Sequence, residues 1–311
     1  MPDPLRNATL RQLRALAATA SSGNLTAAAR KLGVTQPAVS LQLQTLQRLA
    51  GLPLLQRAGG GALATDAGRA LLALEARVAL AFRDCAAQLD AIRGAGGGRV
   101  AIGAVSTAKY FVPAAIGDFA RRHPKVEIKL TIGNRAEIIA GLRDFSLDGA
   151  ITGRPPEDLD LERRLIGDHP HIVIAPPGHA LARRRRLPLA ALAKEPFVVR
   201  EAGSGTRLLM QRFFDEEKFE PKISMEIDSN ETIKQAVMAG LGVAFLSAHT
   251  VATEIADGRL IALDVAGLPL LRQWFVVHRR ERVLLPPAAA MLEFMARDAA
   301  RFLPHAKAKR R

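Results

Sequence analysis

The feature that most constrains the fold is a pair of short helical patterns that meet at Gly33. Asn24 or Thr26 can cap the first pattern, and Gly33 can end it because glycine tolerates the left-handed conformation of a tight turn. Thr35 can cap the second pattern. Two helices joined by such a short turn form the helix-turn-helix unit, which lays its second helix in the major groove of DNA. We therefore expect a helix-turn-helix at about residues 25–44.

The second of these helices has one apolar face and one unusual exposed face. A projection at about 100° per residue places Val39, Leu43, Leu46 and Ala50 on one side, which must be buried. The opposite side would expose a leucine among hydroxyl and amide groups. This suits a groove, where leucine can touch a thymine methyl and glutamine can bond an adenine edge. The residues expected to bind DNA are Thr35, Gln36, Pro37, Ser40, Leu41, Gln44 and, in a β-wing at 52–65, Arg57.

The distribution of charge supports the same interpretation. The formal net charge is +14, and residues 1–65 contain seven basic residues but a single acidic one, Asp3. A stretch without further carboxylates suits a polyanion-binding surface, because each carboxylate would repel phosphate. A basic solvated face without a partner is the alternative. Two other basic runs, residues 183–186 and a tail at 306–311, are expected to be a solvated loop and a disordered segment.

Several parts follow one another along the 311-residue chain. We expect a winged helix-turn-helix DNA-binding domain at 8–65, a long linker helix at 66–93, a glycine hinge at 94–98 and an effector-binding domain at 99–305. The last part alternates strands with helices, which implies a mainly parallel α/β sheet, and its length implies two lobes. The expected strands include 100–102 and 126–132, and the expected helices are 113–122, 137–143, 206–216 and 231–239.

The helix at 66–93, which Asp66 can cap, carries a heptad pattern. Leu71, Val78, Cys85 and Ile92 lie at seven-residue steps, with Leu74, Ala81 and Gln88 between them. Such a pattern indicates a coiled-coil seam, so the helix is expected to form a homodimer with its copy and to use Cys85 as a small core residue. Packing of the helix on its own domain is the alternative, because Ala81 and Gln88 are weak seam residues.

Hydroxyl, amide and basic side chains follow successive strands of the α/β part. Ligands of open parallel sheets bind at this edge, and helix N-termini there favour anions. The residues expected to bind an effector are Ser106, Thr107, Lys109, Asn134, Arg135, Thr152, Arg154, Ser204, Thr206 and Arg207. Alternatively, the hydroxyl groups are ordinary helix caps and the arginines pair with acids such as Glu137 and Asp158.

Patterns typical of other protein classes are missing from the sequence. The glycine loops fit neither a phosphate-binding loop nor a dinucleotide fingerprint, and no serine has the context of a catalytic nucleophile. The seven histidines lack metal-ligand spacing, and His169 and His171 are expected to form a strand-edge or surface pair. We therefore expect no enzymatic activity, no catalytic residue, no metal site and no prosthetic group.

The sequence also limits where in the cell the protein can be. The single cysteine excludes an internal disulfide, and no apolar run approaches the roughly 20 residues that a membrane span needs. The N-terminus lacks the apolar segment of a signal peptide. These observations predict a cytoplasmic protein without a membrane partner.

Four segments resemble, in order, the LysR-type transcriptional regulators. They are TLRQL at 9–13, NLTAAARKL at 24–32, VTQPAVS at 34–40 and LATDAG at 63–68. The chain departs from the family where Glu is usual near Gln47 and where a Phe-Glu pair is usual at Leu55 and Gln56. The resemblance covers the whole chain. It implies a winged helix-turn-helix, a linker helix and a two-lobed periplasmic-binding-protein-like domain, with double-stranded promoter DNA and RNA polymerase as partners.

The second half is similar to one branch of the family, the regulators of Calvin-cycle (RuBisCO) operons. The matching segments are VSTAKYF at 105–111, GNR at 133–135, TGRPP at 152–156, REAGSGTR at 200–207, SNETIKQAVMAGLG at 229–242 and WFVVH at 274–278. This branch implies a homotetramer and an effector that is a phosphorylated metabolite or NADPH. The expected function is regulation of carbon-fixation genes by a small anionic metabolite. A LysR-type regulator of another metabolic operon and a cytosolic small-molecule-binding protein are the alternatives, and whether it activates or represses stays open.

Overall fold

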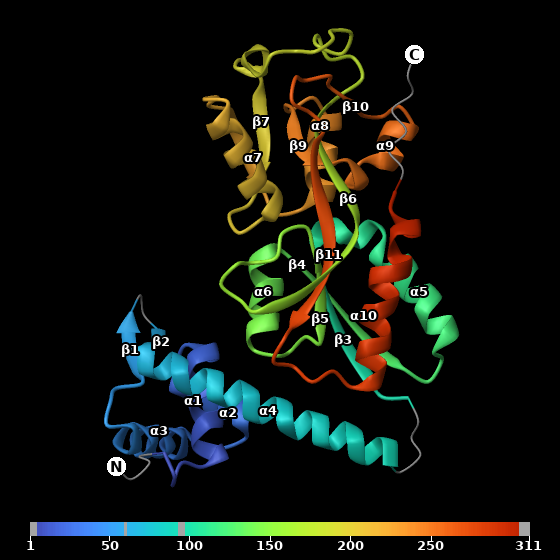
Figure 1. Cartoon of the computed structure of the whole chain (residues 1–311). Coiled ribbons are helices and arrows are strands. Elements are labelled where there is room, and N and C mark those ends of the chain that lie inside the picture. The colour runs from blue at the N-terminus through green and yellow to red at the C-terminus, as the bar shows by residue number, and fades with distance from the viewer. Residues whose placement is uncertain (1–4, 59–60, 93–96, 305–311) are drawn as a thin grey trace. The chain divides into compact units, whose positions relative to one another are not determined.

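The computed structural model of the chain describes residues 5–58, 61–92 and 97–304 (Figure 1). The chain divides into two compact units, residues 1–89 and residues 90–311. Within the described ranges, no helix combines the length and the apolar character that crossing a membrane requires. The expected basic tail at 306–311 lies outside the described residues.

The first unit is a three-helix core followed by a hairpin and a long helix. Its elements are α1 (Leu10–Ser22), α2 (Leu25–Leu32), α3 (Gln36–Ala50), β1 (Leu55–Ala58), β2 (Gly61–Ala64) and α4 (Asp66–Ile92). The helices begin and end at local signals. Asn24 accepts a hydrogen bond from the backbone N–H of Ala27 at 2.8 Å, and Gly33 ends α2 with a φ of 67°. The helix-turn-helix expected around Gly33 is therefore confirmed.

Helix α3 buries the face that its periodicity predicts. Val39, Leu43 and Leu46 are 1%, 6% and 0% exposed, and Ala50 is half-buried. They pack with residues of α1 such as Leu16, so the apolar face fixes how α3 lies on the other helices. Thr35 occupies the N-cap position, but its side chain makes no capping hydrogen bond. Pro37 lies in the first turn, where its missing N–H is not needed.

A threonine, not the expected aspartate, caps the long helix α4. The Thr65 hydroxyl accepts a hydrogen bond from the Gly68 N–H at 3.1 Å and donates one to the Pro53 carbonyl at 2.7 Å. The prediction that Asp66 caps α4 is wrong, because Asp66 is the first helical residue and its carboxylate pairs with Arg69. Thr65 thereby connects the segment before the hairpin to the start of α4.

The expected coiled-coil seam is only partly available on α4. Leu71 is buried and Leu74 packs with it against the helix-turn-helix core, so these two residues are already used inside one chain. Further along, Phe82 is 58% and Leu89 is 48% exposed. Cys85 is exposed in the single chain, as a residue of a seam between two chains would be, and Val78 is half-buried. The side chains of Gln88 and Ile92 lie outside the described part of the chain.

The second unit contains a mixed sheet. Among the described residues its strand order is β10-β6-β11-β5-β3-β4, and β9 also pairs with β6. The strands are β3 (Arg99–Val105), β4 (Glu127–Gly133), β5 (Gly149–Thr152), β6 (Leu161–Ala175), β9 (Ala244–Ser247), β10 (Ile261–Ala262) and β11 (Leu270–Arg279). The expectation of a mainly parallel sheet is wrong. Strand–helix alternation correctly makes β3 parallel to β4 and β5, but β11 is antiparallel to both β5 and β6.

Strands β6 and β11 belong to both lobes (Figure 1). Ile166 and Trp274 lie in the core of the first lobe, whereas Val173, farther along β6, lies in a core of the second lobe. The first lobe also holds η1 (Ser106–Tyr110), α5 (Val112–Arg122), α6 (Arg135–Arg143), α10 (Pro286–Asp298) and η4 (Ala299–Phe302). The second also holds η2 (Leu189–Leu192), β7 (Pro196–Arg200), α7 (Gly205–Glu216), β8 (Lys222–Ile227), α8 (Asn230–Met238), η3 (Ala248–Thr250) and α9 (Ala252–Ala256).

The expected glycine hinge at 94–98 is described only at its end. Residues 93–96 lie outside the described ranges, whereas Gly97 and Gly98 pack closely on the first lobe. The Glu127 N–H donates to the Gly98 carbonyl at 2.9 Å, and a Cβ on Gly97 would lie 1.5 Å from the Lys125 carbonyl oxygen. These two glycines therefore permit close backbone packing.

Substitution of Gly68 tests the packing of α4 in the first unit. A Cβ at this position would lie 2.0 Å from the Leu54 carbonyl oxygen, which is backbone and cannot rotate away. We expect Gly68→Ala to destabilise the first unit by about 1–3 kcal/mol, the usual cost of overpacking. Denaturant unfolding of the full chain measures the loss. Gly61→Ala is the control, because its Cβ would meet Gly23 at an ordinary 3.5 Å. Equal stability of the two variants would contradict this account.

Candidate functional site

The exposed face of α3 has the composition that its projection predicts. Leu41 is 60% exposed, and Gln36, Pro37 and Gln44 are also exposed, whereas Ser40 is half-buried. Thr35 is exposed at the start of the helix. A large apolar side chain thus lies in the open among amide groups, on a surface with many basic residues and few acids.

The hairpin after α3 forms the expected wing. Strands β1 and β2 pair antiparallel, and Arg57 lies opposite Ala62. The side chain of Arg57 is outside the described part of the structure. Gln47, which stands where the family usually has Glu, accepts a hydrogen bond from the Leu54 N–H at 3.0 Å. This departure from the family pattern therefore leaves the support of the wing in place.

A cavity of about 630 Å³ lies in the second unit. Residues from the ends of β3, β4 and β5 line it together with the start of α7. Eight of the ten expected effector-binding residues take part: Ser106, Thr107, Asn134, Arg135, Thr152, Arg154, Ser204 and Thr206. The edge at which parallel strands end was thus a sound guide to a cavity.

Local capping explains the position of several lining residues. Asn134 caps α6 in a reciprocal arrangement with Glu137, and Ser204 caps α7 by accepting from the Arg207 N–H at 3.5 Å. Ser106 and Thr107 begin η1, which is a short 3₁₀ helix of five residues. These residues follow the ends of strands or start helices, and their hydroxyl and amide groups therefore lie at the cavity wall.

Two of the expected basic residues do not line the cavity. Lys109 pairs with Glu231 at 3.4 Å, and Arg207 pairs with Glu226 at 3.6 Å. Arg207 also donates to the Arg200 carbonyl at 3.1 Å. Opposite charges nearby hold both side chains, and residue spacing alone gives no sign of these partners.

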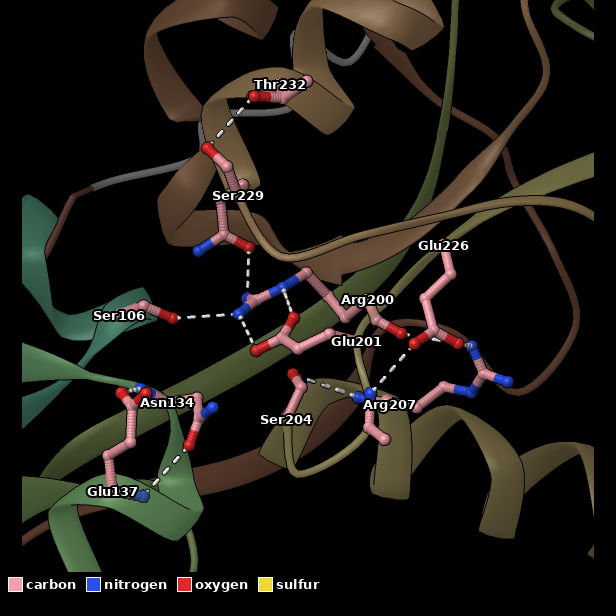
Figure 2. A network of polar contacts seen from close by, with 12 residues as sticks. Ser106, Asn134, Glu137, Arg200, Glu201, Ser204, Arg207, Glu226, Ser229 and Thr232 are labelled. Atoms are coloured by element: carbon pink, nitrogen blue, oxygen red, sulfur yellow. Dashed lines mark hydrogen bonds and ion pairs between the residues drawn. The ribbon is translucent and has the colours of Figure 1, made fainter. Parts of the chain in front are cut away.

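A buried arginine that the sequence reasoning missed lies between the lobes (Figure 2). Arg200, 3% exposed, lines the cavity at the end of β7. Its guanidinium donates to Glu201 at 2.7 and 2.8 Å, to Asn230 at 2.6 Å and to the Ser106 hydroxyl at 3.2 Å. Ser106 belongs to the first lobe and Arg200 to the second. This network therefore joins the lobes at the cavity wall.

Further arginines give the cavity a basic character. Arg163, Arg212 and Arg272 line it in addition to those that were expected. The Arg135 Nε donates to the Arg154 carbonyl at 3.2 Å, and burial together with the Arg154 charge lowers the pKa of Arg135. Such a group is stabilised by an anion placed beside it.

The alternative of arginines paired with acids holds only in part. Arg154 lies 3.6 Å from Glu157, whose side chain is 83% exposed, and Asp158 pairs with Arg143 instead. Glu137 accepts from the Asn134 N–H at 2.8 Å as part of the helix cap. Exposed pairs of this kind are weak, so Arg154 can bind a ligand at little cost.

An aromatic cluster lies at the wall formed by β6 and β11. His169 and His171 are 4% and 2% exposed, so the expectation of a strand-edge or surface pair is wrong. The His169 ring stacks on Trp274 with 3.7 Å between ring centroids, and Trp274 donates to His249 Nδ1 at 3.1 Å. β6 lies inside the sheet rather than at its edge, which a local pattern cannot reveal. The described part of the chain holds no group of three or more side chains suited to a metal ion.

Comparison with known families assigns both units. Residues 10–69 match the bacterial regulatory helix-turn-helix protein family, lysR family, and residues 93–300 match the LysR substrate binding domain. The chain belongs to the LysR family of bacterial transcriptional regulators. The arrangement of helix-turn-helix, long helix and two-lobed domain agrees with this membership, and the resemblance seen in the sequence is confirmed.

Relatives and solved structures place the chain more narrowly. It is 50% identical to the HTH-type transcriptional regulator CbbR of Xanthobacter flavus, over 95% of this chain and 90% of that protein. It is 39% identical to the RuBisCO operon transcriptional regulator of Allochromatium vinosum, over 94% and 97%. The regulatory domain of Synechocystis CcmR in complex with 2-PG matches with 35% identity and a TM-score of 0.62, over 64% of this chain and 96% of that domain. Full-length CbnR complexed with its target DNA shares the fold at 23% identity and a TM-score of 0.62, over 94% and 100%.

The buried histidines predict a loss of stability in mild acid. Burial lowers the pKa of His171 to about 3, whereas an unfolded histidine has a pKa near 6.5. Below pH 6.5 the unfolded chain binds a proton that the folded chain does not, so stability falls as pH falls towards 3. One such histidine lowers stability by about 1.4 kcal/mol in total between pH 7.5 and 5.5, and by about 1.4 kcal/mol for each further pH unit below that. Unfolding at pH 7.5, 6.5 and 5.5 should show a smaller loss for His171→Phe than for the parent. Identical slopes would exclude this assignment.

Proposed function

We propose that this protein is a LysR-type regulator that binds promoter DNA and controls carbon-fixation genes in response to a small phosphorylated metabolite. The identity of 50% with a CbbR over 95% of the chain carries the proposal, because it includes both the DNA-binding unit and the cavity. The alternative of a cytosolic binding protein leaves the helix-turn-helix and its exposed Leu41 unexplained. A regulator of another metabolic operon is the second candidate, and binding to carbon-fixation promoters separates the two.

We propose that α3 reads bases in the major groove. Pro37, Ser40, Leu41 and Gln44 lie along its accessible side, and Thr35 and Gln36 at its start are placed to donate to phosphate. Arg57 in the wing adds a backbone or minor-groove contact. The low acid content of the unit supports this assignment, because phosphate contacts dominate the affinity for DNA.

Gln44→Ala tests base reading. Because a paired amide discriminates between bases, we expect the variant to lose about 1–3 kcal/mol of discrimination at one base position and to retain non-specific binding. Gln42→Ala is the matched control, since Gln42 lies on the opposite side of α3. Competition binding with single-base variants of an upstream carbon-fixation promoter measures the effect. Equal discrimination by both variants would contradict the assignment.

A phosphorylated ligand fits the cavity by charge and by hydrogen bonding. Ser106, Thr107, Thr206 and backbone N–H groups at the start of α7 supply neutral donors, and Arg135 and Arg154 supply charge. The regulatory domain of CcmR is known in complex with 2-PG, 2-phosphoglycolate, which supports a phosphorylated ligand for this chain as well. The cavity volume of about 630 Å³ also leaves room for a larger ligand, so NADPH is the second candidate.

The ligand proposal is tested by stabilisation of the full chain. A ligand at 100 times its Kd raises stability by about 2.7 kcal/mol, so 2-phosphoglycolate or NADPH should raise the unfolding temperature and alter the promoter footprint. The double variant Thr107→Ala, Arg154→Ala should lose both effects. Arg143→Ala, which removes an exposed arginine paired with Asp158, should retain them. A double variant that responds like the parent would overturn the placement.

We propose that α4 supplies the dimer contact. Phe82, Cys85 and Leu89 follow helical spacing with Val78, and the first three are exposed, which favours a seam displaced from the one first expected. Two copies would present two recognition helices to two half-sites. Assembly of dimers into a homotetramer and contact with RNA polymerase complete the proposed mode of action in the cytoplasm.

A further inference from the structure

His169 is the one cavity-lining histidine whose two ring nitrogens are both unpaired within the described residues. It is 4% exposed and lies in β6, opposite Arg272 of β11. Its neighbours are satisfied. His171 Nδ1 lies 3.1 Å from the His169 carbonyl oxygen, and His249 accepts from Trp274. A buried polar group without a partner is costly, so the position of His169 at the cavity wall requires an explanation.

The imidazole is held rigidly by aromatic stacking. Its ring lies at 18° to Trp274 with 3.7 Å between centroids, and the His171 ring is 4.2 Å away. Trp274 is fully buried in the core of the first lobe, so its ring cannot rotate freely and holds the stacked His169 ring in place. Burial and the two neighbouring histidines hold the pKa of His169 well below its usual value. The ring is therefore neutral and offers one N–H donor and one nitrogen acceptor.

Gly153 brings the edge of this ring to the cavity wall. A Cβ on Gly153 would lie 2.7 Å from His169 Nδ1 and 3.1 Å from Cε1. Gly153 itself lines the cavity, between Thr152 and Arg154, which also line it. The absence of a side chain at this position leaves the Nδ1 edge of the imidazole uncovered next to a residue of the cavity wall.

We propose that His169 is a specificity-determining residue that hydrogen-bonds a hydroxyl group of the ligand. This inference rests on the proposed binding of a phosphorylated metabolite in the cavity and narrows that metabolite to a phosphorylated hydroxy compound. 2-Phosphoglycolate, which has a phosphate and a carboxylate but no free hydroxyl group, would then occupy the same cavity with lower affinity. A hydroxyl both donates and accepts, so it can use either nitrogen of a neutral imidazole. A phosphate or carboxylate oxygen only accepts, and an apolar group satisfies neither nitrogen.

Two ligands that differ by one hydroxyl test the proposal. The probes are D-3-phosphoglycerate and 3-phosphonooxypropanoate, which share a phosphate and a carboxylate, and only the first has the 2-hydroxyl. Calorimetric titration of the full chain should give at least about tenfold tighter binding of the hydroxylated probe, because a site built for a hydroxyl rejects the analogue that lacks it. His169→Phe keeps an aromatic ring against Trp274 and removes both nitrogens. The variant should bind the hydroxyl-free probe with the affinity of the parent, and its affinities for the two probes should agree within about twofold.

Two further variants sharpen the experiment. Gly153→Ala places a methyl group against His169 Nδ1 and should reduce the preference for the hydroxyl in the same way. His179→Phe is the control, because His179 lies beside Glu195 at 3.2 Å and does not line the cavity. It should keep the full preference.

The outcomes separate this inference from the function on which it rests. Equal affinity of the parent for both probes overturns the role of His169 and leaves a phosphate-binding cavity intact. No binding of either probe by the parent overturns the placement of a phosphorylated ligand as well. If His169→Phe bound neither probe, the imidazole would be needed for the structure of the cavity wall, and its role in specificity would also be overturned.

Discussion

The antiparallel pairing of β6 with β11 is the constraint on which the second unit depends. The two strands pair from Leu270 with His171 to Arg279 with Leu161, and the register shifts between Trp274 and Phe275. The hydrophobic cores of both lobes include residues of this pair of strands, so the strands connect the two cores. The pair also supplies the wall of the cavity between the lobes. A change that displaced these strands would therefore alter both cores and the cavity together.

The lobes also meet through polar contacts made along η1. Arg200 of the second lobe donates to Ser106, and Glu231 of α8 accepts from the Tyr110 hydroxyl at 2.5 Å and pairs with Lys109. Burial raises the pKa of Tyr110, so its hydroxyl keeps the proton that it donates. The first residues of η1 line the cavity and its last residues hold the opposite lobe. A ligand that binds one arrangement of the lobes more tightly would shift the population towards it.

Local signals predicted much of this architecture. Helix caps and glycine turns located α2 and α3, and the strand ends identified eight lining residues, because these features depend on neighbours a few positions apart. The reversal of β6 and β11 depends on pairing between residues about a hundred positions apart in the chain, which no local pattern records. For the same reason, the sequence concealed the burial of His169, the partners of Arg207 and the role of Arg200.

The departures from expectation on α4 have a similar origin. The seven-residue repeat gives Leu71 and Val78 the same position in the expected seam, yet Leu71 packs into the helix-turn-helix core. The apolar side chains left exposed, Phe82 and Leu89, became apparent only once that core had been assigned. The periodicity thus predicted the helix and its apolar side. The burial of each side chain in the structure shows which apolar residues stay exposed and can contact another chain.

We propose that a phosphorylated ligand binds between the lobes, against the cavity wall formed by β6 and β11. A crystal structure of the full chain with bound 2-phosphoglycolate tests it most directly. We expect phosphate oxygens within hydrogen-bond distance of Thr107 and the start of α7, with the ligand beside Arg135 and Arg154. A ligand bound outside this cavity would contradict it.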